Sequence, residues 1–490
     1  MKTALQTYEP VLGFEVHVEL NTATKMFSTA TNAFGDQPNS NVTAGDLGMP
    51  GTLPTINQAG IDYGIKLGLA LNCTIAPESR FARKQYFYPD LGKNYQTSQL
   101  EPAIAYDGYV DVELDDGEIF RVEIERAHIE EDAGKLTHMG STGRIHDASA
   151  SLVDYNRAGV PLVEIVSRPI TGAGERAPEL ARAYLATIRD IVKALNVSDA
   201  RMERGNIRCD ANVSVMPIGS ETFGTRTETK NVNSTRAVAA AVESEIIRQA
   251  KALDTGESIT QETRHWDEEA RSTRSGRPKS DADDYRYFAD PDLVPIVTDE
   301  AWIERLRAEL PENPLERRRR LREEWAFSES EFRDVVAAGV LDEIQATIVE
   351  GATAEAARKW WMGEIARIAN EKGVSPEGLG VTPADVVEIE RLIADKTIND
   401  KIARQVVGYV ADGEGRPTEV VEARSLAVVS DDGALTTAVD EAMAANPDVV
   451  ERIKGGHMQA VGALIGPVMK ARKGQADAGR VREIILEKIG

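Results

Sequence analysis

The alternation of apolar and polar residues from Leu12 to Leu20 constrains this chain more than any other feature of its sequence. In LGFEVHVEL every second residue is apolar, and Glu15, His17 and Glu19 stand between the apolar positions. A period of two is the geometry of a β-strand, whose successive side chains point to opposite faces. We therefore expect a strand with one apolar face and one face that carries two carboxylates and a histidine.

Three later segments carry polar residues in a similar way. The polar positions of residues 206–215 are Asn206, Arg208, Asp210, Asn212 and Ser214, those of residues 226–231 are Arg226, Glu228 and Lys230, and residues 128–132 read HIEED. The plain alternative is the wet face of an antiparallel sheet, which pattern alone favours about equally. However, a face that combines His, Asp, Asn and Arg with carboxylates suits a metal–nucleotide complex. Carboxylate oxygens suit Mg²⁺, and a histidine ligand would favour Mn²⁺ or contact phosphate directly.

The order of patterns along the 490 residues predicts an α+β amino-terminal part and a helical carboxy-terminal part. A chain of this length exceeds one hydrophobic core, so we expect about three domains. The first 290 or so residues are rich in alternating segments and turns, which indicates a largely antiparallel sheet. From Asp299 onward amphipathic helical patterns dominate, with a capping box at Ser328 and Glu331 and a cap before a proline at Thr382 and Pro383.

Composition excludes several classes of protein. No apolar run reaches the roughly 18 residues of a membrane span, and the first twenty residues lack a signal peptide, so we expect a cytoplasmic protein with no membrane partner. The only cysteines, Cys73 and Cys209, exclude a disulfide framework and a Cys-rich zinc site. Cys209 stands on the apolar face of its segment, which disfavours a glutaminase nucleophile. Walker, dinucleotide-binding and G-x-S-x-G motifs are absent from the sequence.

The net charge of −23 argues against a nucleic-acid partner, because phosphate backbones are usually met by basic surfaces. Two local clusters differ from this average. Residues 452–490 are basic overall, and residues 317–322 contain five arginines. A solvated helix face is the plainer interpretation of either cluster, and on sequence alone we favour it.

Several sequence blocks, in order along the chain, resemble the signature blocks of the GatB family, whose members belong to the bacterial aspartyl/glutamyl-tRNA amidotransferases. The blocks are GFEVHVEL (13–20), RKQYFYPDL (83–91), HIEEDAGKL (128–136), DYNRAGVPLVEIVS (154–167), VSDARMERGNIRCDANVS (197–214), FGTRTETKNVNS (223–234) and DDYRYFADPDL (283–293). Residues 455–474, GGHMQAVGALIGPVMKARKG, are similar to the family's YqeY-like tail. The resemblance covers nearly the whole chain.

The resemblance implies a fold and a reaction. The fold is an antiparallel-sheet cradle domain like that of glutamine synthetase and guanido kinases (residues 1–293), an all-α helical domain (294–408) and a YqeY-like tRNA-binding tail (409–490). The reaction is the ATP- and Mg²⁺-dependent phosphorylation of the side-chain carboxylate of Glu-tRNA(Gln), Asp-tRNA(Asn) or both. Ammonia from the glutaminase subunit GatA then amidates it, and GatC braces the heterotrimer.

Matching motifs carry the family's site residues over to this sequence. The expected divalent-metal ligands are Glu15, His17, Glu130, Glu131 and Glu203. Lys84 and Lys230 are expected to act with them in catalysis. The expected nucleotide or phosphate contacts are Arg208, Asp210 and Asn231. Tyr86, Tyr88 and Asp90 are expected to line the active site or the ammonia path, with core packing as the alternative for the tyrosines. The expected tRNA contacts are Lys454, Lys470, Arg472 and Lys473.

The sequence also departs from the family pattern. The early loop, residues 26–48, has no cysteine, so we expect no zinc although many family members carry a cysteine zinc site there. Ala82, Gly92, Asn94 and Ala289 replace or alter family residues near the site. We expect the polar loop 271–283, followed by DYRYF (284–288), to close over the site. Two alternatives remain open, a tRNA-binding scaffold without kinase chemistry and a stand-alone kinase of small carboxylic acids.

Overall fold

The computed structural model describes residues 1–99, 101–139, 148–278, 285–428, 432–471, 476 and 478–489. The chain forms two compact units, Met1–Arg319 and Arg320–Gly490. Each unit is described by itself. The three-domain boundaries expected from sequence, after residues 293 and 408, remain a prediction.

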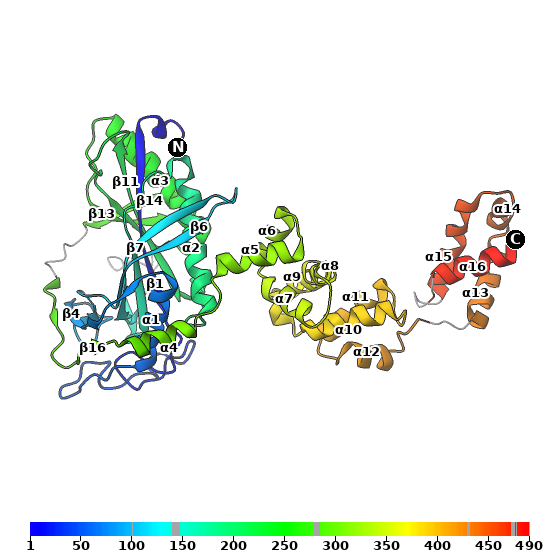
Figure 1. Ribbon diagram of the computed structural model, residues 1–490, viewed down its shortest axis with the longest axis horizontal. Helices are drawn as coiled ribbons and strands as arrows, with labels where there is room; N and C mark the ends of the chain where they lie inside the picture. Colours follow the sequence, from blue (N-terminus) through cyan, green and yellow to red (C-terminus); the bar gives the residue numbers. More distant parts are fainter. Residues whose placement is uncertain are drawn as a thin grey trace. The chain divides into compact units, whose positions relative to one another are not determined.

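A nine-stranded sheet organises the first unit, with the strand order β14-β13-β12-β11-β1-β10-β7-β6-β2 (Figure 1). All neighbouring strands pair antiparallel except β12 and β13, which are parallel. The predicted, largely antiparallel sheet is therefore confirmed. The strands are β1 (Tyr8–Glu19), β2 (Thr74–Ile75), β6 (Ala105–Glu113), β7 (Ile119–Glu131), β10 (Pro161–Ser167), β11 (Ile207–Pro217), β12 (Thr227–Lys230), β13 (Glu262–Asp267) and β14 (Ser272–Pro278).

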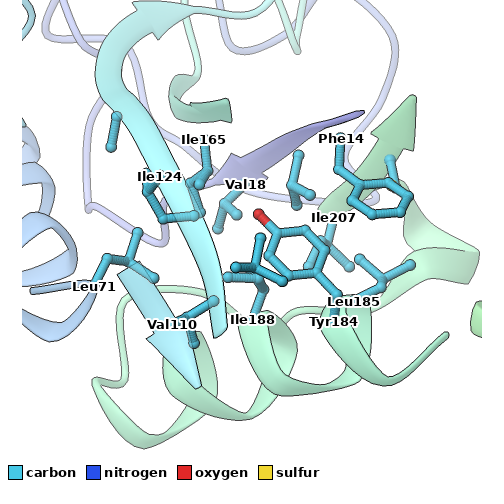
Figure 2. Packing of buried hydrophobic residues seen from close by; sticks show 14 of the residues in the cluster. Phe14, Val18, Leu71, Val110, Ile124, Ile165, Tyr184, Leu185, Ile188 and Ile207 are labelled. Atoms are coloured by element: carbon cyan, nitrogen blue, oxygen red, sulfur yellow. The ribbon is translucent and has the colours of Figure 1, made fainter. Parts of the chain in front are cut away.

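Strand β1 lies near the middle of this sheet, between β10 and β11. Its apolar residues Phe14, Val16 and Val18 are buried, as the alternation predicted. They face helices α2 (Ala177–Ala194) and α3 (Thr235–Asp254), which cover the apolar face of the sheet. Figure 2 shows the packing, in which the Phe14 ring stacks on Tyr184 with 5.0 Å between centroids. Burial of this face fixes the register of β1, because a slip by one residue would turn its carboxylates into the core.

Shorter elements complete the first unit. Helices α1 (Gln58–Ala70) and α4 (Glu300–Ala308) contact each other, and α5 (Pro314–Trp325) begins in this unit. A three-stranded sheet joins β15 (Phe288–Ala289), β4 (Ala82–Gln85) and β5 (Tyr95–Ser98). Two-stranded sheets join β16 (Ile296–Val297) to β3 (Glu78–Ser79) and β8 (Lys135–Met139) to β9 (Ala150–Asp154). Short 3₁₀ helices span Ala4–Gln6, Gly174–Arg176 and Met202–Arg204.

The predicted loop 271–283 is partly a strand, because residues 272–278 form β14 at the edge of the large sheet. This corrects the expectation of a polar loop across the whole segment. The alternating polar and small residues of STRSGRP can pair along β13, which neither a polar composition nor a lack of apolar residues prevents. Residues 279–284, which include Asp284 of the DYRYF segment, lie outside the described residues.

The second unit is helical, as predicted. The capping box at Ser328 and Glu331 is confirmed at the start of α6, and Thr382 caps α10 ahead of Pro383. Its helices after α5 are α6 (Glu329–Ala338), α7 (Leu341–Val349), α8 (Ala354–Lys359), a π-helical turn (Trp360–Ile365), α9 (Ala366–Lys372), a 3₁₀ turn (Pro376–Leu379), α10 (Pro383–Ala394), α11 (Asp400–Ala411), α12 (Pro417–Ala423), α13 (Asp432–Ala445), α14 (Pro447–Lys454), a 3₁₀ turn (Met458–Val461), α15 (Gly462–Ala471) and α16 (Ala478–Ile489).

The helices of the second unit build two apolar cores. One is centred on Trp360, Trp361 and Val406, and the other on Leu435, Val439 and Ile485. Over the described part of the chain, no helix combines the length and apolar character that a bilayer crossing requires.

Candidate active site

The face of the large sheet opposite α2 and α3, here called the polar face, carries a row of ionic side chains across four neighbouring strands. The register places His128 of β7 opposite Glu164 of β10, Glu164 opposite His17 of β1, and His17 opposite Arg208 of β11. Directly opposed residues in an antiparallel sheet have neighbouring side chains. The row therefore brings together residues that are up to 191 positions apart only because β1, β7, β10 and β11 are adjacent in the sheet.

The first of two acidic groups on the polar face, here called the histidine group, consists of His17, Glu130 and Glu164. One ligand atom from each lies within 4.8 Å of the other two. His17 Nε2 lies 3.7 Å from a Glu164 carboxylate oxygen, and Ser98 donates a hydrogen bond of 3.0 Å to Glu130. Because Glu130 is buried and His17 and Glu164 are half-buried, a cation here would replace lost water with protein ligands.

The second group, here called the carboxylate group, consists of Glu15, Asp210 and Glu228. Its carboxylate oxygens also lie within 4.8 Å of one another. Lys230 Nζ lies 2.5 Å from Asp210 and 3.5 Å from Glu228, and its ammonium balances part of their charge. Glu15 belongs to this group and His17 to the first, two residues further along the same strand, so the two groups lie side by side.

Electrostatics show how tightly these groups interact. Burial alone would lower the pKa of His128, but the Glu164 carboxylate and hydrogen bonds with Glu130 and Glu164 raise it to about 9. Burial would raise the pKa of Glu164, yet the charges of His17 and His128 hold it well below its usual range. Near neutral pH, His128 is therefore a buried cation bound to an ionised Glu164, with Nε2 3.2 Å from the carboxylate.

Two lysines gain charge from the same carboxylates. Desolvation opposes the charged form of Lys84, but Glu130 and other acidic neighbours raise its pKa. Desolvation likewise opposes the charge of Lys230, and Asp210 and Glu228 raise its pKa well above the usual range. Both predicted catalytic lysines therefore stay cationic beside the acidic groups.

A third cluster lies where β1, β7 and β11 end, and it contains Arg208. Arg208 Nη2 lies 2.5 Å from Asp132, and Asn206 donates a hydrogen bond of 2.9 Å to Glu19. Burial, followed by the charge of Asp132 and a hydrogen bond with it, raises the pKa of Glu19 to about 8. At neutral pH a protonated Glu19 therefore shares its hydrogen with an ionised Asp132, which in turn holds the Arg208 guanidinium.

Glu131 does not join the histidine group, contrary to the expectation from sequence. It is adjacent to Glu130 on β7, and consecutive residues of a strand point to opposite faces. Its carboxylate pairs with the Lys93 ammonium and accepts a hydrogen bond of 2.9 Å from the Thr97 backbone. It lines a separate cavity of about 220 Å³ together with Arg83 and residues of the early loop.

A largely apolar cavity of about 210 Å³ adjoins the carboxylate group. Glu15 and Asn212, which are joined by a hydrogen bond of 3.1 Å, form part of its wall. The loop after β11 passes so close to that strand that a Cβ on Gly224 would stand 2.2 Å from the Val215 carbonyl oxygen, so only glycine fits there. The lining residues are Val11, Leu12, Gly13, Phe14, Glu15, Glu125, Val166, Ser167, Pro169, Asn212, Ser214, Phe223, Gly224 and Arg226.

The other predicted residues fall into three places. Tyr86 and Tyr88 stack on each other after β4, with 5.7 Å between centroids, and lie apart from the hydrophobic core. Asp90 is half-buried, and Asn231 is exposed just after β12. Lys454 and Lys470 lie in the second unit, with Lys454 exposed at the end of α14 and Lys470 in α15.

Three predicted residues are not described. The side chain of Glu203, in the 3₁₀ turn Met202–Arg204, and all of Arg472 and Lys473 lie outside the described part of the structure. Sequence reasoning in turn misses Glu164, which contacts both His17 and His128. The signal for it is the single carboxylate within the otherwise apolar run PLVEIV, residues 161–166.

Comparison with known proteins places the chain in a class and then in a family. Residues 10–304 match the family described as the GatB/GatE catalytic domain, so the first unit belongs to that class of catalytic domains. Residues 342–489 match the family described as the GatB domain. The chain belongs to the GatB family.

Relatives from several bacteria are similar over nearly their whole length. The chain is 66% identical over 488 residues to a protein of Paenarthrobacter aurescens (strain TC1), covering 99% of this chain and 97% of that protein. It is 59% identical over 488 residues to one from Streptomyces avermitilis, and 60% identical over 486 residues to one from Clavibacter sepedonicus, each with the same 99% and 97% coverage. All three relatives are named as GatB-type subunits of an aspartyl/glutamyl-tRNA(Asn/Gln) amidotransferase.

Proposed function

We propose that this chain is the kinase and transamidase subunit of a tRNA-dependent amidotransferase. It transfers the γ-phosphoryl group of ATP to the side-chain carboxylate of Glu-tRNA(Gln), Asp-tRNA(Asn) or both. Ammonia then displaces the phosphate to give the amide. A free carboxylate is a poor acceptor for ammonia, and the acyl phosphate supplies a leaving group.

The single observation that carries this proposal is the pairing of the histidine and carboxylate groups on one strand, through His17 and Glu15. Phosphoryl transfer needs little covalent chemistry from a protein, and depends on positioning and on neutralising charge. Two adjacent acidic groups with flanking ammonium groups suit a metal-bound triphosphate better than an ordinary solvated sheet face does.

The donors fit a divalent cation. Glu130 and Glu164, or Glu15, Asp210 and Glu228, offer the oxygens that Mg²⁺ accepts while it keeps several waters. His17 adds a nitrogen, which Mn²⁺ accepts more readily than Mg²⁺ does. When bound, such an ion would neutralise phosphate oxygens and polarise the group that is transferred.

The chain's own residues have separate tasks in this proposal. Lys84 and Lys230, which stay cationic among the carboxylates, balance the negative charge of phosphate and substrate carboxylate. Asp132 holds Arg208 at the edge of the site, where its guanidinium can orient an anionic group. The apolar cavity beside Glu15 is large enough to take the base of the nucleotide.

The remaining parts of the proposal rest on membership of the family. The first unit is a cradle domain like that of glutamine synthetase and guanido kinases, the partner GatA supplies ammonia, GatC braces the assembly, and the carboxy-terminal tail binds tRNA. The basic residues Lys454 and Lys470 of the tail are consistent with this assignment, since they provide positive charge in an acidic chain.

The test is a reconstituted complex of this chain with its glutaminase partner subunits. Hydrolysis of ATP stimulated by Glu-tRNA(Gln) or Asp-tRNA(Asn), with trapping of an acyl phosphate, supports the proposal. Stimulation by free glutamate instead would favour a kinase of small carboxylic acids, and no hydrolysis a tRNA-binding scaffold. The variant His17→Ala should abolish acyl phosphate while tRNA binding persists. Loss of tRNA binding with phosphorylation of bound substrate intact would refute the site.

A further inference from the structure

Aromatic and basic residues gather where β4 meets β15, beside the histidine group. Six rings come from two short segments, RKQYFY (83–88) and YRYF (285–288), which the pairing of β4 with β15 brings together. We call this surface the aromatic platform. It consists of Tyr86, Phe87, Tyr88, Tyr285, Tyr287 and Phe288, with the cations Lys84 and Arg286.

The rings contact one another rather than the core. Tyr86 stacks on Tyr88 at 5.7 Å, and Tyr285 lies edge-on to Tyr86 at 6.5 Å and to Tyr287 at 6.1 Å. None of these rings belongs to the main hydrophobic cluster of the described first unit. Phe87 is 65% exposed, which is unusual for a large apolar side chain without a binding role.

Cations lie over the rings of the platform. Lys84 Nζ is 4.7 Å from the Tyr285 centroid, and the Arg286 guanidinium is 5.8 Å from that of Phe87. The nearby Arg83 has a different task, because it is bound to Asp290 at 2.9 Å and Asp292 at 2.7 Å. Those two carboxylates are thereby neutralised, so the platform keeps a positive character within an acidic chain.

The platform is continuous with the proposed site. The charge of Lys84 is stabilised by Glu130 and Glu164 of the histidine group, and also by Tyr285 and Tyr287 of the platform. A molecule that lies across the rings would therefore end beside the residues proposed to hold the metal. The platform is open at Phe87 and closes toward Lys84.

We propose that the aromatic platform stacks the unpaired nucleotides at the 3′ end of the aminoacyl-tRNA and so delivers the esterified amino acid to the histidine group. This inference rests on the proposed function. Proteins bind unpaired nucleotides by stacking bases on aromatic rings, with arginine and lysine beside the backbone phosphates. An apolar peptide would not use the two cations, and the base of ATP already has an apolar cavity next to the carboxylate group.

The experiment compares two tRNA probes on the complete complex with its partner subunits. One probe is the intact tRNA, and the other is the same tRNA without its unpaired 3′ nucleotides. We expect the wild-type complex to bind the intact tRNA on the order of tenfold or more tightly, since each stacked base contributes substantially to affinity. The double variant Tyr86→Leu with Tyr285→Leu should bind both probes alike, and Phe87→Ser should reduce the ratio without disturbing the core.

Two control variants separate stacking from folding. Tyr86→Phe keeps the ring and should keep the ratio. Tyr109→Leu, which removes a half-buried ring that lies 3.9 Å from Arg121 on β6, should also keep it. An unchanged ratio in the double variant, or a raised KM for ATP with the ratio intact, would overturn the platform. A wild-type complex that discriminates the probes but forms no acyl phosphate would overturn the proposed function and leave the platform standing.

Discussion

His128 and Glu164 lie directly opposite each other on β7 and β10, with His128 Nε2 3.2 Å from the Glu164 carboxylate. The same carboxylate lies 3.7 Å from His17 Nε2. Glu164 is thus shared by two histidines, one of which is a buried cation. It orients both rings at the centre of the polar face.

Glu164→Gln should impair the site although Glu164 belongs to no recognised motif. The amide keeps the shape but removes the charge that stabilises the His128 cation. We expect affinity for Mg²⁺ or Mn²⁺ to fall about 10–100-fold, measured from the metal dependence of ATP hydrolysis. The exposed Glu175→Gln is the matched control and should match wild type. A Glu164→Gln complex with unaltered metal dependence would remove Glu164 from the site.

Glu130→Gln and Glu131→Gln should have different effects although the residues are adjacent. Glu130 belongs to the histidine group, whereas Glu131 pairs with Lys93 on the other side of the strand. We expect Glu130→Gln to weaken metal dependence about tenfold or more, and Glu131→Gln to leave the metal concentration at half-maximal activity near the wild-type value. Equal shifts in both variants would show that Glu131 joins the metal site in the working enzyme.

Glu19→Gln should change how stability depends on pH. The pKa of Glu19 is raised to about 8 in the folded chain, so the folded form holds a proton that the unfolded form has lost above pH 4.5 or so. This contribution to stability is complete below that pH and is lost as the pH rises through 8. The wild type should therefore lose stability relative to Glu19→Gln between pH 5 and 8, by on the order of 1 kcal/mol per unit at most. Urea midpoints across this range measure it, and parallel curves would contradict the assignment.

Tyr184→Phe should stabilise the first unit. The Tyr184 hydroxyl is fully buried beneath the sheet and has no hydrogen-bond partner among the described residues, so removing it relieves an unpaired polar group. We expect a gain of about 1 kcal/mol in urea denaturation. The contrasting variant is Tyr8→Phe, whose hydroxyl donates a hydrogen bond of 3.0 Å to Asp254, and it should lose stability instead. A loss in Tyr184→Phe would indicate an internal water that satisfies the hydroxyl.

Lys470→Glu should weaken tRNA binding through electrostatics alone. Lys470 lies near the end of α15 in the basic tail. Reversing its charge should lower the affinity for all tRNAs alike and reduce the slope of log K against log salt by about 1. Binding titrations from low to moderate salt measure this. A slope equal to that of wild type would place the tail away from the RNA.

The strands of the polar face could be predicted because their residues follow a single physical rule. Alternation in residues 12–20 and 206–215 predicts both the strands and the face on which Glu15, His17 and Asp210 lie. The same rule separates Glu131 from Glu130, although the matched motif HIEED places them together. A family motif gives the residue types, and only the periodicity of the strand gives their direction.

The position of Glu164 could not be predicted in the same way. Its strand is an almost continuous apolar run, which is typical of a strand buried on both faces and carries no alternation. That β10 lies between β1 and β7 is a long-range pairing, which depends on the packing of the whole sheet. The pairing of Tyr86 with Tyr285 across 199 positions is equally absent from local patterns.

The strand register of the polar face also bears on how faulty copies of this chain are removed. His17, Glu164 and Arg208 each alternate with core residues along their strands. A strand that paired one residue out of step would bury an ionic group and expose a hydrophobic one in the same event. Such a copy would unfold and be degraded, so a cell would rarely accumulate intact chains that occupy partner subunits yet lack a working site.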